Sequence, residues 1–307
     1  MRFSTARITK LVSFIVAVVL FAVVSITAIS GYLVYQIIHP PKDTSSFDLS
    51  VMMGRPTTFS FPVENGGTRD GWFFPGLQGA PTIVVCHGYE SQRTDELTLV
   101  TALQDHQYNV FLFDFSGHGT SPGTTTLGYK ETGELESAIR TLATRSDVDT
   151  KHFGLWGTDM GAYAVLEAAE ADPRVTAFAV ADVYDDPQDM LRLQVQQSGL
   201  TAIPYVLNDA NFIFRMANYS DRHKPPASAD IGRTHGIPKL FITSADQPSL
   251  ASDTTQLYNQ APEPKQIVHD STRYRDMSDE DRKNYENAIV NFFLQNLPPV
   301  ESGQSGQ

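Results

Sequence analysis

The chain has 307 residues, of which 41% are hydrophobic and 19% charged, enough for one large globular domain with additional segments. Its 35 acidic side chains outnumber 23 basic ones, and the net charge of −12 argues against nucleic acid as a partner. The single cysteine, Cys86, excludes an intrachain disulfide. No Cys/His spacing typical of a metal site occurs, so we expect neither a metal nor another cofactor.

The first predicted element is an apolar helix over residues 11–38, which contain no charged side chain. This run exceeds the roughly 20 residues that cross a bilayer and the roughly 7–15 apolar residues of a cleaved signal peptide. We therefore predict a transmembrane signal anchor; a cleaved signal and a buried helix of a soluble protein are the alternatives. Arg2, Arg7 and Lys10 predict a cytoplasmic segment 1–10 and a main domain outside the cytoplasm, in a single-pass membrane protein.

Residues 39–50 are polar and contain two consecutive prolines, which predicts a linker to a domain over residues 51–298. The domain begins with two strands, over 57–64 and 71–76, joined by a glycine-rich turn. Short apolar runs then predict buried strands. These runs are residues 81–88, 108–119, 152–157, 175–182, 237–244 and 265–270.

Helical patterns alternate with these strands, at 132–145, 161–170 and 279–297 among others. The alternation predicts an α/β fold with a mostly parallel central sheet flanked by helices. Residues 185–236 interrupt the rhythm, and we interpret them as a small cap insertion over the carboxyl ends of the strands; the alternative is a set of surface helices with no role at a site. The polar residues 299–307 predict a disordered tail.

One motif connects the strand over 152–157 with the helix that follows. Residues 157–161 read Gly-Thr-Asp-Met-Gly, which has the spacing of G-x-S-x-G, the nucleophile elbow of serine hydrolases. Asp159 stands where the serine would be, between Gly157 and Gly161.

Together with this elbow, three further motifs in order resemble the α/β-hydrolase superfamily, in its serine aminopeptidase-like and acyl-hydrolase-like branch. They are His87-Gly88 at a strand end, the turn over 114–123 with Ser116 in place of the usual arginine, and the acid turn "SADQPS" with the helix and strand after it. The resemblance covers residues 55–297 and implies an α/β-hydrolase fold.

The resemblance also implies roles for single residues. Asp159 takes the nucleophile position and Asp246 the acid position, while the backbone amides of Met160 and Tyr89 would be the oxyanion donors. The family places its histidine just after the last strand, where the aligned position, give or take one residue, is Tyr274. Both the serine and the histidine are therefore replaced, and the catalytic triad is degenerate.

The other histidines of the chain are poor candidates for the missing catalytic histidine. His269 is an alternative base, but it stands about five residues early, in or at the end of the last strand. His87 belongs to the turn before Tyr89, where histidine commonly shapes the loop by hydrogen bonding. We expect both to be structural unless the fold brings one of them to Asp159.

Aspartate at the elbow has two interpretations. Haloalkane dehalogenases and epoxide hydrolases, on the same fold, use it as a nucleophile, but hydrolysis of the resulting ester needs the histidine that is missing here. Alternatively, Asp159 is a structural carboxylate that tolerates the strained elbow and accepts hydrogen bonds from the oxyanion amides and the Tyr274 hydroxyl. With Asp246 nearby, one of the two carboxylates would be partly protonated.

Three hypotheses follow. The favoured one is a membrane-anchored pseudohydrolase, retained to bind a partner or an unknown small-molecule or acyl ligand. The second is an active hydrolase of ester, amide or related acyl substrates that uses Asp159 or a non-standard base. The third is a structural or assembly role for the anchored domain.

Overall fold

The computed structural model describes residues 5–42, 47–48, 56–64, 67–221 and 224–299. The chain forms two compact units. The helical unit comprises Met1–Ile38 and Leu191–His223, and the sheet unit comprises His39–Met190 and Lys224–Gln307. Residues 1–4, residues 43–46 and 49–50 of the predicted linker, and the predicted tail except residue 299 lie outside the described residues.

The sheet unit is built on an eight-stranded sheet in the order β1-β2-β4-β3-β5-β6-β7-β8. The two pairings that involve β2 are antiparallel, and all pairings from β4 onward are parallel, which confirms the predicted mostly parallel sheet. The strands are β1 Thr57–Pro62, β2 Thr68–Phe74, β3 Thr82–Cys86, β4 Asn109–Phe113, β5 Phe153–Thr158, β6 Val175–Ala181, β7 Lys239–Ser244 and β8 Lys265–Asp270.

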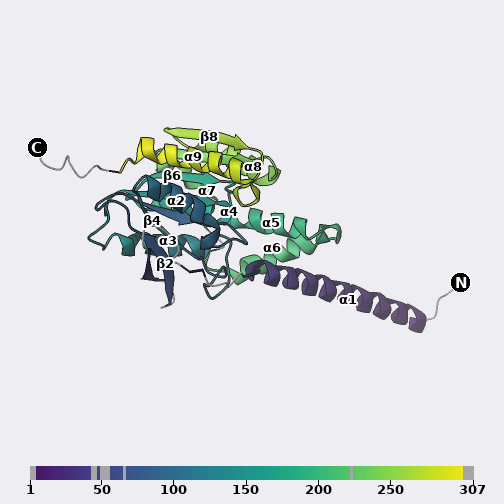
Figure 1. Ribbon diagram of the computed structural model, residues 1–307. Helices are drawn as coiled ribbons and strands as arrows, with labels where there is room; N and C mark the ends of the chain where they lie inside the picture. Colours follow the sequence, from purple (N-terminus) through teal and green to yellow (C-terminus); the bar gives the residue numbers. More distant parts are fainter. Residues whose placement is uncertain (1–4, 43–46, 49–55, 65–66, 222–223, 300–307) are drawn as a thin grey trace, which may run out of the picture. The chain divides into compact units, whose positions relative to one another are not determined.

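Helices cover both faces of the sheet because the central strands are apolar on both sides; every residue of β3 and β4 is buried. On one face α2 (Leu97–Asp105) contacts α9 (Asp279–Asn296), over a core that includes Ile83 and Val85 (Figure 1). The opposite face carries α3 Tyr129–Leu142, α4 Asp159–Ala171 and α8 Pro248–Gln260.

Two details of the sheet unit differ from the predicted elements. We did not predict α2, because its nine residues carry only a short apolar pattern, with Leu99, Val100 and Leu103 buried. The predicted insertion over residues 185–236 is also split between the two units. Residues 191–223 belong to the helical unit, whereas α7 (Ala227–Asp230) and the 3-10 turn η5 (Ile231–Thr234) contact α4. That the insertion covers the carboxyl ends of the strands stays a prediction.

The helical unit contains α1 (Thr5–Ile38), η4 (Leu200–Ala202) and α6 (Val206–Ala217), while α5 (Pro187–Gln197) leads into it from the sheet unit. The predicted apolar helix is therefore confirmed, and it begins earlier, at Thr5. Within it, residues 8–38 are long and apolar enough to cross a membrane. The helix α6 packs against the carboxyl-terminal part of α1.

Candidate functional site

The turn from β5 into α4 places Asp159 at the carboxyl edge of the sheet, with a φ of 38°. Two glycines allow the turn. A Cβ on Gly161 would lie 2.4 Å from the carbonyl oxygen of Cys86, and one on Gly157 would lie 2.5 Å from the carbonyl carbon of Gly161. Only glycine fits at these close approaches, so the strand, the strained residue and the helix have the geometry of a nucleophile elbow.

The carboxylate of Asp159 bonds to two backbone amides. Its Oδ1 accepts the N–H of Tyr89 at 2.6 Å and also the N–H of Met160. These are the two amides to which the sequence resemblance assigns oxyanion binding. The loop that follows β3 and contains Gly88 lies close against the same carboxylate, because a Cβ on Gly88 would be 2.5 Å from Asp159 Oδ2. The side chain of Asp159 therefore occupies the position where the two amides converge.

Burial raises the pKa of the Asp159 carboxyl to about 7. The two amide hydrogen bonds favour the charged form and act against this rise, as does the nearby charge of Arg275, while the charge of Asp182 adds to it. Near neutral pH the carboxyl is thus present in both its protonated and its ionised form.

Asp182 is a second buried carboxylate at this edge, which we did not predict. It directly follows β6 with a φ of 52°, and it accepts the backbone N–H and the hydroxyl of Ser244 at 2.8 and 2.6 Å. Burial raises its pKa to about 6, and the charge of Asp246 adds to the rise. The signal in the sequence was the aspartate that ends "VTAFAVAD", the same position after a buried strand that marks the elbow.

Asp246 follows β7 and completes a row of carboxylates at the ends of three neighbouring strands, β5, β6 and β7. Its side chain is exposed and accepts the backbone N–H of Arg273 at 3.0 Å. Among the described residues, no group of three or more acidic, histidine or cysteine side chains has the arrangement that holds a metal ion.

The structure does not bring His269 to the elbow. It is exposed on the edge strand β8, where its Nδ1 lies 2.8 Å from the hydroxyl of Thr243. Two strands separate β8 from β5, which puts about 14 Å between them at the usual spacing of strands.

His87 is fully buried, and both of its ring nitrogens have backbone partners. Nε2 accepts the N–H of Phe115 at 3.0 Å, so Nδ1 carries the proton and donates to the carbonyl of Gly88 at 2.8 Å. Burial lowers its pKa. His87 therefore holds the loop in place and has no free nitrogen to take up a proton from a nucleophile.

Tyr274 does not contact Asp159, contrary to the expected hydrogen bond. It begins the 3-10 turn η6 (Tyr274–Asp276), and its side chain is buried in the core against Trp156. The hydroxyl donates to Glu286 at 2.6 Å and lies 3.2 Å from the hydroxyl of Thr98. The aromatic ring of Tyr274 is thus buried in the core and does not lie at the elbow.

Another residue of this turn, Arg275, contacts the loop that follows Tyr89. Its guanidinium donates to the carbonyl of Glu90 at 3.1 Å, next to the oxyanion loop, and its charge lowers the pKa of Asp159. A cation therefore stands in the region to which the resemblance assigns the histidine, one residue beyond Tyr274.

The turn over 114–123 is held by hydrogen bonds within itself and from other segments of the sheet unit. Asp114 accepts the N–H of Arg93 at 2.8 Å and the N–H of Thr120 at 3.0 Å. At Ser116, which replaces the usual arginine, the guanidinium of Arg69 from β2 donates to the serine hydroxyl at 2.6 Å. An arginine from another strand thus reaches the position where the family's turn carries one.

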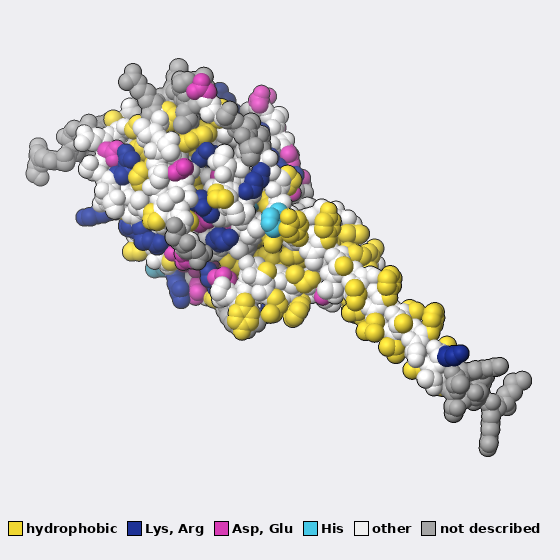
Figure 2. Space-filling model, turned by 90° about the horizontal axis from the view of Figure 1, so that it is seen from below, with side chains coloured by type: hydrophobic (Ala, Val, Ile, Leu, Met, Phe, Trp, Pro, Cys, Tyr) yellow, Lys and Arg dark blue, Asp and Glu magenta, His cyan; other side chains and the backbone are white. Residues whose placement is uncertain are grey.

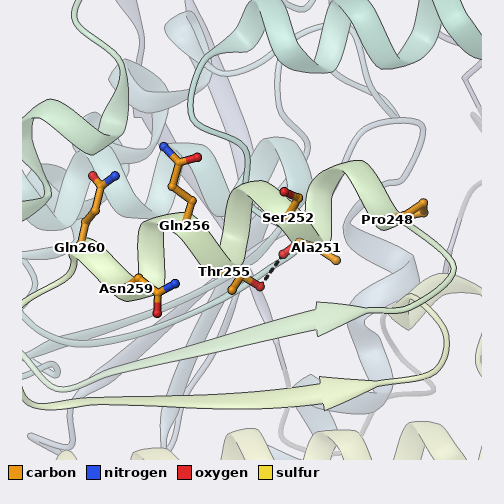
Figure 3. A pocket seen from close by; sticks show the side chains of 7 residues that line it. All are labelled: Pro248, Ala251, Ser252, Thr255, Gln256, Asn259 and Gln260. Carbon is orange, nitrogen blue, oxygen red and sulfur yellow. Dashed lines mark hydrogen bonds between the residues drawn. The ribbon is translucent and has the colours of Figure 1, made fainter.

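A shallow hollow also lies along α8, outside the elbow region (Figure 3). No charged side chain lines it, and the Thr255 hydroxyl donates to the carbonyl of Ala251 at 2.6 Å, so it holds no activated nucleophile. Its lining residues are Pro248, Ala251, Ser252, Thr255, Gln256, Asn259 and Gln260.

The sheet order, the elbow and the flanking turns define an α/β hydrolase fold. The sequence model of the alpha/beta hydrolase family matches residues 83–293, more than two thirds of the chain. The chain belongs to this family.

Relatives with a similar sequence include the uncharacterised protein YfhR of Escherichia coli O157:H7, 27% identical over 250 residues that cover 78% of this chain and 81% of YfhR. YqkD of Bacillus subtilis is 28% identical over 251 residues, covering 78% and 80%. Among solved structures, the esterase Pf2001 of Pyrococcus furiosus has a TM-score of 0.67 at 17% identity, over 85% of this chain and 99% of the esterase. At this identity the likeness shows the shared fold alone.

Proposed function

We propose that this protein is a membrane-anchored pseudohydrolase, which keeps the α/β-hydrolase fold to bind a small-molecule or acyl ligand, or a protein partner, without turning it over. One observation carries the proposal: Asp159 Oδ1 accepts both the Tyr89 and the Met160 amide. An acyl substrate needs these donors for the oxygen that becomes negatively charged in the transition state. In this protein the elbow side chain already occupies them.

The surroundings of Asp159 support the same conclusion. Its hydrogen-bond partners in the described part of the chain are backbone amides, so no side chain there is placed to accept or deliver a proton. The neighbouring Arg275 is a cation that does not act as a base at neutral pH. Asp182 is held by Ser244 instead. A hydrolytic cycle needs a nucleophile, a base and free oxyanion donors together.

The alternative is an active hydrolase in which Asp159 attacks the substrate. With a pKa of about 7, only part of the Asp159 carboxyl is ionised at neutral pH, and this part is the form that can attack a substrate. To attack carbon, Oδ1 would have to leave the two amides, or Oδ2 would have to serve. The covalent ester would then need a base for its hydrolysis.

Turnover assays separate the two functions. The purified full chain, incubated with p-nitrophenyl acetate, p-nitrophenyl butyrate and 1-chlorobutane, is expected to release product no faster than the buffer. Asp159→Asn is the matched control, and its rates should equal those of the natural chain. Steady turnover that disappears in Asp159→Asn would overturn the pseudohydrolase proposal and establish the active hydrolase.

We also infer that α1 anchors the chain in a membrane, with the sheet unit outside the cytoplasm. In intact cells, added protease is expected to digest the sheet unit, and an alkaline carbonate wash is expected to leave the chain in the membrane pellet. The control is Val18→Arg with Leu20→Arg, two changes in the exposed middle of α1 that should release the chain. A sheet unit that resists protease in intact cells, or a natural chain released by carbonate, would contradict the inference.

A further inference from the structure

The helix α6 has one buried apolar face and one exposed apolar face. Val206, Ala210 and Phe214 are buried on the packed face. On the other face, Phe212 and Met216 lie one helical turn apart, and two tyrosines flank the helix: Tyr205 directly before its first residue and Tyr219 two residues after its last. These side chains are Tyr205, Phe212, Met216 and Tyr219, with exposed fractions of 73%, 62%, 47% and 57%. We call them the apolar stripe.

Exposed large hydrophobic side chains are concentrated in the helical unit. Apart from Phe47, every one among the described residues lies on α1 or on the apolar stripe. Figure 2 shows hydrophobic side chains along the length of α1. A stripe of this kind on a soluble surface is unusual, so the apolar stripe needs an occupant.

The place where α6 meets α1 identifies the occupant. The hydroxyl of Ser30 donates to the carbonyl of Val206 at 3.3 Å, and Gly31 lies against Ile213. Residues 8–29 of α1, before this contact, are exposed or half-exposed. They span about 33 Å, close to the roughly 30 Å of a hydrocarbon core. The contact with α6 thus begins where α1 would leave the core.

The side chains around this level are those that occupy a membrane–water interface. Tyr32 and Tyr35 are exposed on the last turns of α1, and Tyr205 and Tyr219 are at the two ends of the apolar stripe. Tyrosine places its ring among acyl chains and its hydroxyl among headgroups. The exposed Arg215, next to Met216, is available to lipid phosphates.

We propose that α6 is an interfacial helix whose apolar stripe inserts into the outer leaflet of the bilayer that α1 spans. The proposal rests on the inferred membrane anchor. The proposed occupant of the stripe is a lipid surface, and the described residues 191–221 then lie on the membrane and not free in water.

Depth-dependent quenching tests the proposal on the full chain in vesicles of phosphatidylcholine and phosphatidylglycerol. Phe212→Cys and Met216→Cys, each labelled with a small fluorophore, report on the stripe. The native Cys86 is fully buried and is left in place, with the unlabelled background subtracted. Val18→Cys in the middle of α1 reports on the anchor, and Gln260→Cys, exposed on α8, is the matched control.

Lipids with a nitroxide near the headgroup are expected to quench labels at 212 and 216 about threefold more than the label at 260, while lipids with a deep nitroxide quench the label at 18. If 18 is quenched and 212 and 216 match 260, α6 is not interfacial and the anchor stands. If 18 is not quenched by any lipid, the anchor itself fails. Labels at 212 and 216 that are shielded from iodide but not quenched by lipid indicate a second copy or another protein on the stripe, which also overturns the proposal.

Discussion

Asp159→Ser combined with Arg275→His is expected to give this protein esterase activity. The serine removes the carboxylate from the Tyr89 and Met160 amides, so both donors become free for a substrate oxygen. The histidine stands at the residue whose side chain bonds to the carbonyl of Glu90, next to Tyr89. The same segment contacts the acid position, because the backbone N–H of Arg273 donates to Asp246. General base catalysis typically contributes 10²–10⁴-fold, and we expect kcat/KM for p-nitrophenyl butyrate to rise about 10²-fold over Asp159→Ser alone.

Asp159→Ser combined with Tyr274→His is the matched control for this result. The two double variants differ by one position in the turn, but the side chain of Tyr274 lies in the core with its hydroxyl on Glu286. A histidine there is expected to give no gain in rate and to lower the stability by roughly 3 kcal/mol, as large aromatic truncations in a core do.

Labelling with a fluorophosphonate, which reacts with an activated serine, measures the same property independently of turnover. The Arg275→His double variant is expected to label, and the Tyr274→His double variant is not. If the Arg275→His variant melts at the natural temperature but neither labels nor turns over, then η6 does not supply the histidine position and our placement of Arg275 at the elbow is wrong.

The central sheet was predictable because its strands have a recognisable local sequence pattern. The runs that became β3 to β7 are apolar and end in glycine or a polar residue, and a parallel sheet buried on both faces requires this pattern. The elbow was predictable for a similar reason, since Gly157 and Gly161 are spaced by backbone contacts that no other residue allows. In contrast, α2 is short and weakly patterned, and its helix depends on tertiary packing against α9 and β4.

The surroundings of Asp159 were less predictable, because they depend on tertiary contacts. Tyr274 and Arg275 are neighbours in one 3-10 turn, and only the tertiary structure shows that the ring of Tyr274 enters the core while Arg275 bonds to Glu90. Asp182 resembles any aspartate after a strand until Ser244 of the adjacent strand is seen to bond to it. The bonds from Tyr89 and Met160 to Asp159, however, follow from the fold, since the loop after β3 and the elbow after β5 bring these two amides together in α/β hydrolases.

The carboxyl of Asp159 also predicts how stability depends on pH. Its pKa in the folded chain, about 7, is above the value of about 3.9 for an unfolded chain. Well below the unfolded pKa of about 3.9, the carboxyl is protonated in both states and does not lower the stability. As the pH rises toward 7, the unfolded chain loses this proton before the folded chain does, so the free energy of unfolding falls. Above pH 7 both states have lost the proton, and the free energy of unfolding does not fall further for this reason.

Asp159→Asn is therefore expected to stabilise the protein at pH 8, and this gain should become small as the pH falls toward 4. The amide oxygen of asparagine can accept the same two backbone N–H groups but carries no charge to bury. A shift of three pKa units corresponds to about 4 kcal/mol, and because the Asp159 side chain is partly reached by solvent we expect on the order of 2 kcal/mol, which raises Tm by about 4–8 °C.

Thermal unfolding of the full chain in detergent, followed by tryptophan fluorescence at pH 4.5, 6 and 8, measures this difference. Asp159→Ala is the control, because it removes both the charge and the acceptor; the gap between the Asn and Ala variants should not change with pH. A natural chain that melts above Asp159→Asn at pH 8 would show that the ionised carboxylate stabilises the fold. If the expected order holds, the protein retains at neutral pH a carboxylate that an amide would replace with a gain in stability, and such a residue is kept for what it binds, since strain and buried charge persist where function requires them.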